Sequence, residues 1–139
     1  MLFDPTESIQ LQGHTGPFIQ YTHARIKSIL RKAESMNVVV DSSELKNIAL
    51  LEPVEREIIF RLNSYHAKLQ EAAREYSPAV VSNFAYDLAK EYNQFYQAIP
   101  IFNESDPAKL KFRIGFSSVV ADVLNGSMKL LGISVPEKM

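Results

Sequence analysis

The chain has 139 residues, which is enough for one compact domain and too few for two ordinary ones. Its 46% hydrophobic and 22% charged residues are typical of a globular fold and exclude a disordered or collagen-like chain. Fifteen basic residues against sixteen acidic ones give a formal net charge of -1, so a polyanion has to be bound by a local group of residues.

The chain opens with a lead-in over residues 1–13, where Phe3, Ile9 and Leu11 indicate a short extended segment. One strand cannot form a sheet alone, and helical patterns begin directly afterwards, so we expect a helical domain over residues 14–139. The first helix opens at Thr15, which can cap free backbone N–H groups, ahead of a proline in the first turn. Its apolar stripe consists of Phe18, Thr22, Ile26, Ile29, Leu30 and Ala33.

Residues 38–40 are three valines and predict a short extended segment, and residues 48–51 predict a short helix. A second long helix is predicted over residues 53–76, because apolar residues recur there at alternating three- and four-residue steps. These positions are Val54, Ile58, Leu62, Tyr65, Leu69, Ala72 and Tyr76.

Two further helices are predicted in the second half of the chain. The third starts at Ser77 and Pro78 and ends near Pro100, and the fourth starts at Asp106 and ends at Gly132, a residue type that often terminates helices. Connections of modest length between helices favour a bundle. The predicted fold class is therefore all-α, with about four main helices.

No catalytic group of residues stands out. Since the histidines at positions 14, 23 and 66 include no pair four residues apart and cysteine is absent, we expect no metal site and no disulfide. We expect charged residues early in the second helix to be solvated: Glu55, Arg56, Glu57 and Arg61. No apolar run approaches the roughly 18 residues that span a bilayer, and no secretory signal is present, so we expect a cytoplasmic protein without a membrane partner.

One edge of the first helix carries a stripe of mixed character beside the apolar face: Phe18, Tyr21, Arg25, Ser28 and Lys32. Lys27 and Arg31 are expected on other faces. An aromatic ring next to a guanidinium is the minimum needed to stack an unpaired base and hold its phosphate. From spacing alone, however, we favour a structural role, in which Tyr21 seals the core boundary and Arg25 pairs with a carboxylate.

Three segments resemble the helical C-terminal part of arginyl-tRNA synthetases. Residues 13–26 read G-H-T-G-P-F-I-Q-Y-T-H-A-R-I, where the family commonly has G-N-T-G-P-Y-x-Q-Y-A-H-A-R-I. Residues 84–96 resemble its Y-L-Y-D-L-A-x-x-F-N-x-F-Y stretch, with D-L-A-K where the D-A-L-R tetrad would be sought. Residues 123–139 are similar to its V-L-x-N-G-x-x-L-L-G-I-x-x-P-E-R-M ending. The departures are His14 for Asn and Phe18 for Tyr, which loses a hydroxyl.

The resemblance implies a helical anticodon-binding domain that follows a catalytic domain, with residues 1–13 as a truncated lead-in. The class I signatures H-I-G-H and K-M-S-K-S are absent from the sequence, so we expect this fragment to have no catalytic residues and no cofactor of its own. The implied parent attaches arginine to its tRNA with ATP and Mg²⁺, and we expect it to be a monomer.

The resemblance also implies a binding site for the anticodon stem-loop of the tRNA for arginine. The matching positions are Phe18, Tyr21, Arg25, Tyr96 and Met139. Expected phosphate contacts are Lys32, Lys129 and Lys138, within a wider basic set that adds Lys109, Lys111 and Arg113. The alternative is a helical module that docks on a protein through its aromatic stripe. An enzyme in its own right is the weakest reading, because no catalytic set can be assembled.

Overall fold

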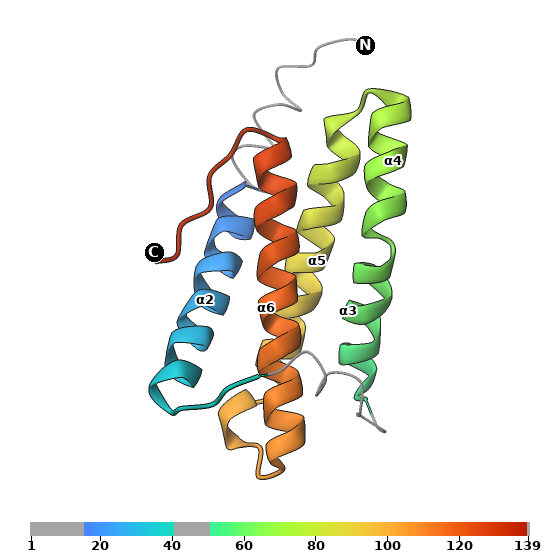
Figure 1. The fold of residues 1–139 in the computed structure, drawn as a ribbon. Helices are drawn as coiled ribbons and strands as arrows, with labels where there is room; N and C mark the ends of the chain where they lie inside the picture. Colours follow the sequence, from blue (N-terminus) through green and yellow to red (C-terminus); the bar gives the residue numbers. More distant parts are fainter. Residues whose placement is uncertain (1–15, 41–50, 139) are drawn as a thin grey trace.

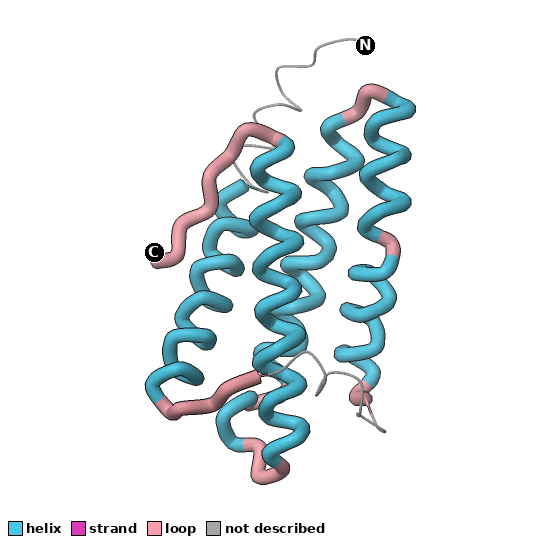
Figure 2. Tube along the Cα trace, in the orientation of Figure 1, coloured by secondary structure: helices cyan, strands magenta, loops and turns pink. Residues whose placement is uncertain are grey.

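The computed structural model describes residues 16–40 and 51–138. The lead-in over 1–13, most of the short helix expected over 48–51, and Met139 lie outside the described residues. The described elements are α2 (Gly16–Ser35), α3 (Pro53–Asn63), α4 (Tyr65–Glu75), α5 (Pro78–Ala98), the short 3-10 helix η3 (Ile101–Asn103) and α6 (Pro107–Leu130). Figure 2 shows helices joined by loops, with no strand in this part of the chain. The predicted all-α bundle is confirmed.

The helices stand side by side along one common direction (Figure 1). α3 and α4 follow each other in one column beside α5, while α6 packs against both α2 and α5. Helix α5 contacts α2, α3, α4 and α6, so it forms the centre of the bundle. Over the described residues, no helix is both long and apolar enough to cross a membrane.

Local sequence signals fix where the helices begin and end. Proline occupies the first turn of α3, α5 and α6, where its missing N–H costs nothing. The side chain of Asp106 accepts a hydrogen bond of 3.0 Å from the backbone N–H of Ala108 and so caps α6. Gly132, just past the end of α6, has a φ of 75°, a left-handed conformation that favours glycine.

The second long helix is not continuous as expected over residues 53–76. It is divided at Ser64 into α3 and α4. The Ser64 hydroxyl donates to the carbonyl oxygen of Arg61 at 2.7 Å, and the Ser64 N–H donates to the same oxygen at 3.0 Å. Both bonds close a tighter turn than the α-helix, because a serine can compete for backbone acceptors. The apolar periodicity continues through Ser64, so the spacing of apolar residues does not reveal the break.

The core is built on apolar side chains of α5, which pack against α2 and α6. Leu88, Tyr92 and Phe95 are fully buried, and the rings of Phe95 and Phe116 meet edge to face at 4.9 Å. The Tyr92 hydroxyl donates to Ser117 Oγ at 2.8 Å, which satisfies a polar group in an apolar region. Burial raises the pKa of the Tyr92 phenol above its usual value.

Two residues expected to be solvated are instead in ion pairs. Glu55 is 2% exposed, and its carboxylate lies 3.6 Å from Nε of Arg113, a residue of α6 that is itself 5% exposed. Arg61 of α3 pairs with Glu91 of α5 at 2.7 Å, and this hydrogen bond raises the pKa of the guanidinium. The expectation was wrong for both, because α3 packs against α5 and the Glu55 side chain reaches Arg113 of α6. Glu57 and Arg56 are exposed as expected.

Residues 38–40 have no regular secondary structure. The side chains of Val38 and Val40 are partly buried and pack against the core, whereas Val39 is exposed. This alternation of buried and exposed residues fits the extended segment predicted for the three valines.

Candidate nucleic-acid interface

The chain beyond α6 folds back along α2 (Figure 1). It is held by three polar side chains of α2, each bonded to a backbone carbonyl oxygen of this tail. The pairs are Gln20 with Ser134 at 2.9 Å, His23 with Pro136 at 2.8 Å, and Arg31 with Glu137 at 3.1 Å. These bonds set the path of the tail, which brings Lys138 next to α2.

Arg25 is the organising residue of the surface between α2 and α5. Its guanidinium carbon lies 4.8 Å from the ring centre of Tyr21 and 4.4 Å from that of Tyr96, within range of cation–π attraction to both. Its Nη2 also donates to the Tyr21 hydroxyl at 2.9 Å. The tyrosine rings are 48% and 39% exposed, so each keeps surface that a ligand can reach.

Asn93 of α5 holds Arg25 in place and was not predicted as a site residue. Its Oδ1 accepts from Arg25 Nη1, while its Nδ2 donates to Thr22 Oγ1 at 2.8 Å and to the Ala89 carbonyl at 2.9 Å. The Asn93 amide, itself held by Thr22 and Ala89, therefore fixes the orientation of the Arg25 guanidinium. The signal was a polar residue on the inward face of α5, one turn from Tyr96, inside a stripe that is otherwise apolar.

These residues border an open hollow of about 490 Å³, called here the first hollow. Its polar and aromatic lining consists of Tyr21, Arg25, Ser28, Arg31, Tyr96 and Lys138. The structure therefore brings together four positions named from the sequence, namely Tyr21, Arg25, Tyr96 and Lys138. Arg31 was expected on another face but belongs to this group, because the tail packs beside it and supplies the far wall.

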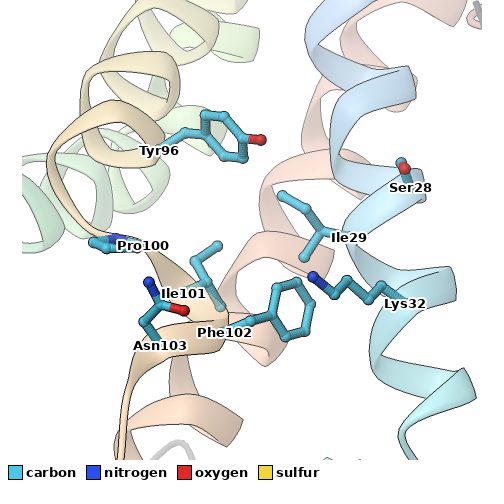
Figure 3. Close-up of a pocket in the computed structure, with 8 residues that line it drawn as sticks. All are labelled: Ser28, Ile29, Lys32, Tyr96, Pro100, Ile101, Phe102 and Asn103. Atoms are coloured by element: carbon cyan, nitrogen blue, oxygen red, sulfur yellow. The ribbon is translucent and has the colours of Figure 1, made fainter.

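A second hollow of about 390 Å³ adjoins the first and shares Ser28, Ile29 and Tyr96 with it. Figure 3 shows the Phe102 ring of η3 facing the ammonium of Lys32 across the gap between η3 and α2. Lys32 Nζ lies 4.5 Å from the centre of that ring. The side chain of Asn103 completes the wall. Phe102 and Asn103 were not predicted, since they follow the third helix in a segment without a periodic pattern.

The other residues named from the sequence lie elsewhere. Phe18 lines neither hollow and packs against Tyr86, with ring centres 5.4 Å apart. Lys129 is exposed in the last turn of α6 and also lines neither hollow. Met139 is outside the described residues. Arg113, one of the wider basic set, is buried and ion-paired, so it is not a surface phosphate contact.

The lining of the two hollows has one sign of charge. Arg25, Arg31, Lys32 and Lys138 contribute, and none of the described residues in either lining is acidic. A patch of this kind attracts an anion locally although the chain as a whole carries a net charge of -1. Aromatic rings with free surface can stack unpaired bases, and the surrounding cations can contact their phosphates. The arrangement suits single-stranded nucleic acid.

An all-α bundle with an aromatic and cationic hollow between α2 and α5 has the features of a helical nucleic-acid-binding domain. The family model described as the DALR anticodon binding domain matches residues 19–139. The chain therefore belongs to the DALR anticodon-binding domain family.

The relatives of this chain are much longer proteins. The chain is 48% identical over all 139 residues to an arginine–tRNA ligase of Flavobacterium psychrophilum, of which it spans 22%, and 46% identical to that of Parabacteroides distasonis, of which it spans 23%. Among solved structures, the arginyl-tRNA synthetase of Thermus thermophilus superimposes with a TM-score of 0.77 at 30% identity, covering 99% of this chain and 23% of that one. The chain thus spans less than a quarter of these proteins.

Proposed function

We propose that this domain binds the anticodon stem-loop of the tRNA for arginine. The observation that carries the proposal is the guanidinium of Arg25 held between two half-exposed tyrosine rings in a hollow whose charged lining is entirely basic. Membership of an anticodon-binding family supports it, as do the names of the relatives.

The binding mode follows from what each side chain can do. Unpaired bases of the loop stack on the free surfaces of Tyr21 and Tyr96, and Arg31 and Lys138 contact the backbone phosphates. Arg25 fixes the spacing of the two rings, because its Nη1 already donates to Asn93 and its Nη2 to the Tyr21 hydroxyl. Phe18 packs against Tyr86 and lines neither hollow. Met139, which follows Lys138 in the sequence, is the remaining candidate for a base contact.

The wider setting is part of the same proposal. The intact protein joins arginine to its tRNA with ATP and Mg²⁺ in a catalytic domain that precedes this one, and the helical domain supplies recognition without catalytic residues, metal or cofactor of its own. We place the protein in the cytoplasm as a monomer. Residues 1–13 then form the lead-in from the catalytic domain, and residues 14–139 form the anticodon-binding domain.

The test is a comparison of aromatic substitutions inside and outside the first hollow. Tyr21→Ala and Tyr96→Ala each remove a stacking ring, which is worth about 1 to 3 kcal/mol, or roughly 5- to 150-fold in affinity. Phe60→Ala is the matched control, because Phe60 is 78% exposed on α3 and lines neither hollow. Affinity for the stem-loop is measured by fluorescence anisotropy, and folding by circular dichroism.

We expect both tyrosine variants to stay folded and bind weakly, and the Phe60 variant to bind like the parent. Equal affinity for all four proteins would contradict the proposal. If Tyr21→Ala and Tyr96→Ala both unfold, these residues are structural and the binding surface lies elsewhere.

A further inference from the structure

The second hollow has a wall that is fixed from behind. The short helix η3 is followed by Glu104, whose carboxylate accepts from the Asp106 N–H at 3.2 Å and from Arg113 Nη1 at 2.9 Å. Arg113 is buried on α6, where Glu55 lies on its other side at 3.6 Å. Since Phe102 and Asn103 directly precede Glu104, this carboxylate ties them to α6.

The charge on Glu104 is maintained by its surroundings. The backbone N–H of Asp106, and then the guanidinium of Arg113, lower the pKa of this carboxyl group below its usual value. The tie between η3 and α6 therefore persists throughout the neutral pH range. A ring held in this way loses little freedom when a ligand stacks on it, which favours binding.

The lining of the second hollow suits a nucleotide better than an apolar partner. It presents one aromatic ring, one ammonium and one amide: Phe102, Lys32 and Asn103. A ring accepts any base face, an ammonium accepts a phosphate, and an amide both donates to and accepts from a base edge. Its volume of about 390 Å³ falls in the range of small-ligand pockets.

Continuity with the first hollow identifies which nucleotide it would take. Tyr96 borders both hollows, so a strand with one base in the first hollow places its neighbour beside Phe102. We propose that the second hollow binds the unpaired nucleotide adjacent to the one held by Tyr21 and Tyr96, with its base on Phe102 and its phosphate on Lys32. This inference rests on the proposed binding of the stem-loop.

Binding exchanges one contact for two others. In the free protein the Lys32 ammonium lies over the Phe102 ring. An incoming base takes that position on the ring, and the flexible lysine side chain turns its ammonium to the phosphate. Asn103 then meets the edge of the base from η3. The site is thus a stacking platform with a weak preference among bases.

The experiment combines single substitutions in the chain with single abasic positions in the anticodon loop. Phe102→Leu keeps an apolar side chain but removes the stacking ring, and Lys32→Gln removes the charge. The matched controls are Phe60→Leu and Lys90→Gln, at exposed positions that line neither hollow. Dissociation constants are measured for each protein with the intact loop and with every abasic loop, after circular dichroism confirms folding.

We expect Phe102→Leu to weaken binding of the intact loop about tenfold, the effect of losing one stacked base. One abasic position should weaken the parent similarly and have no further effect on Phe102→Leu. Tyr21→Ala should lose its sensitivity at a different, neighbouring position. Lys32→Gln should weaken binding and reduce its salt dependence, while both controls match the parent.

Two results would overturn the inference in distinguishable ways. If Tyr21→Ala weakens binding but Phe102→Leu does not, or if Phe102→Leu weakens all abasic loops equally, the second hollow is no nucleotide site and the first stands. If the parent chain does not bind the stem-loop, the proposed function fails, and this inference fails with it.

Discussion

Substituting Arg113 with methionine tests how the buried charges hold the bundle together. The substitution removes the guanidinium that lies between Glu55 and Glu104 but keeps an apolar side chain of similar length. Glu55, at 2% exposure, is then left in the interior without its countercharge. Removing one partner of a buried ion pair typically costs 3 to 5 kcal/mol.

The expected loss lies at the lower end of this range. The Glu52 N–H still donates to the Glu55 carboxylate at 3.1 Å, and the Glu104 side chain is 22% exposed, so both charges keep part of their solvation or hydrogen bonding. Among the residues that the structure describes, Arg113 Nε also finds no hydrogen-bond partner, which limits what the pair contributes. We therefore expect Arg113→Met to lower the free energy of unfolding by about 3 kcal/mol.

The assay is urea unfolding at neutral pH, followed by circular dichroism. The double variant Arg113→Met with Glu55→Gln should recover part of the loss and be only about 1 kcal/mol less stable than the parent, because a neutral amide is left in place of the unpaired charge. A loss below about 1 kcal/mol for Arg113→Met, or a double variant less stable than the single one, would refute this reasoning.

Three further predictions concern other parts of the chain. Because burial raises the folded-state pKa of Tyr92, the folded form keeps a proton that the unfolded form loses near pH 10, so stability is constant below about pH 10 and falls above it. Tyr92→Phe should reduce this loss of stability at alkaline pH. It should also lower the free energy of unfolding at neutral pH by about 1 kcal/mol, because the hydrogen bond to Ser117 is lost. Urea titrations at several pH values measure both effects, and an unchanged alkaline loss would exclude Tyr92 as its source. A Cβ at Gly126 would meet the Tyr65 hydroxyl at 3.2 Å, so Gly126→Ala should stabilise the Tyr65→Phe variant by about 1 kcal/mol through helix propensity and stabilise the parent by less. Equal effects in the two backgrounds, measured by urea unfolding, would contradict the contact. Lys129→Gln should leave stem-loop affinity within about twofold, whereas Lys138→Gln should lower it several-fold, because only Lys138 lines the first hollow. Anisotropy titrations measure both, and a larger loss for Lys129→Gln would contradict the placement of the RNA beside the tail.

Much of the fold could be predicted because its signals are local. Prolines in the first turns, a capping aspartate and apolar residues spaced three and four apart define α2, α5 and α6. The break at Ser64 could not be predicted, since a serine is compatible with a helix and the apolar pattern continues past it. The burial of Glu55 was missed for a related reason: amphipathic spacing identifies the mainly apolar face but not a charge on it that meets a partner from another helix.

The candidate site, too, could be predicted only in part. Tyr21 and Arg25 lie one turn apart on α2, so their proximity follows from helical geometry, and Tyr96 was added through the family resemblance. The contributions of Asn93, Arg31 and Phe102 depend on how α5, the tail and η3 pack against α2. Such contacts between distant segments leave no periodic signal in a single sequence.

The central claim is that the aromatic and basic surface between α2 and α5 recognises an anticodon loop. The most direct measurement is a titration of the chain with the anticodon stem-loop of the tRNA for arginine and with the same stem-loop carrying changed anticodon bases, each at about 50 mM and about 200 mM salt. Two or three phosphate contacts predict a fall of roughly 7- to 20-fold in affinity between these salt concentrations, because each contact to a single strand contributes a slope of about -0.7.

We expect tighter binding of the unchanged loop, weakened by salt to this extent. Binding that ignores both the anticodon bases and the salt, or no binding to either loop, would contradict it. A salt-insensitive association with a protein through the same aromatic residues would instead support the docking module considered as the alternative.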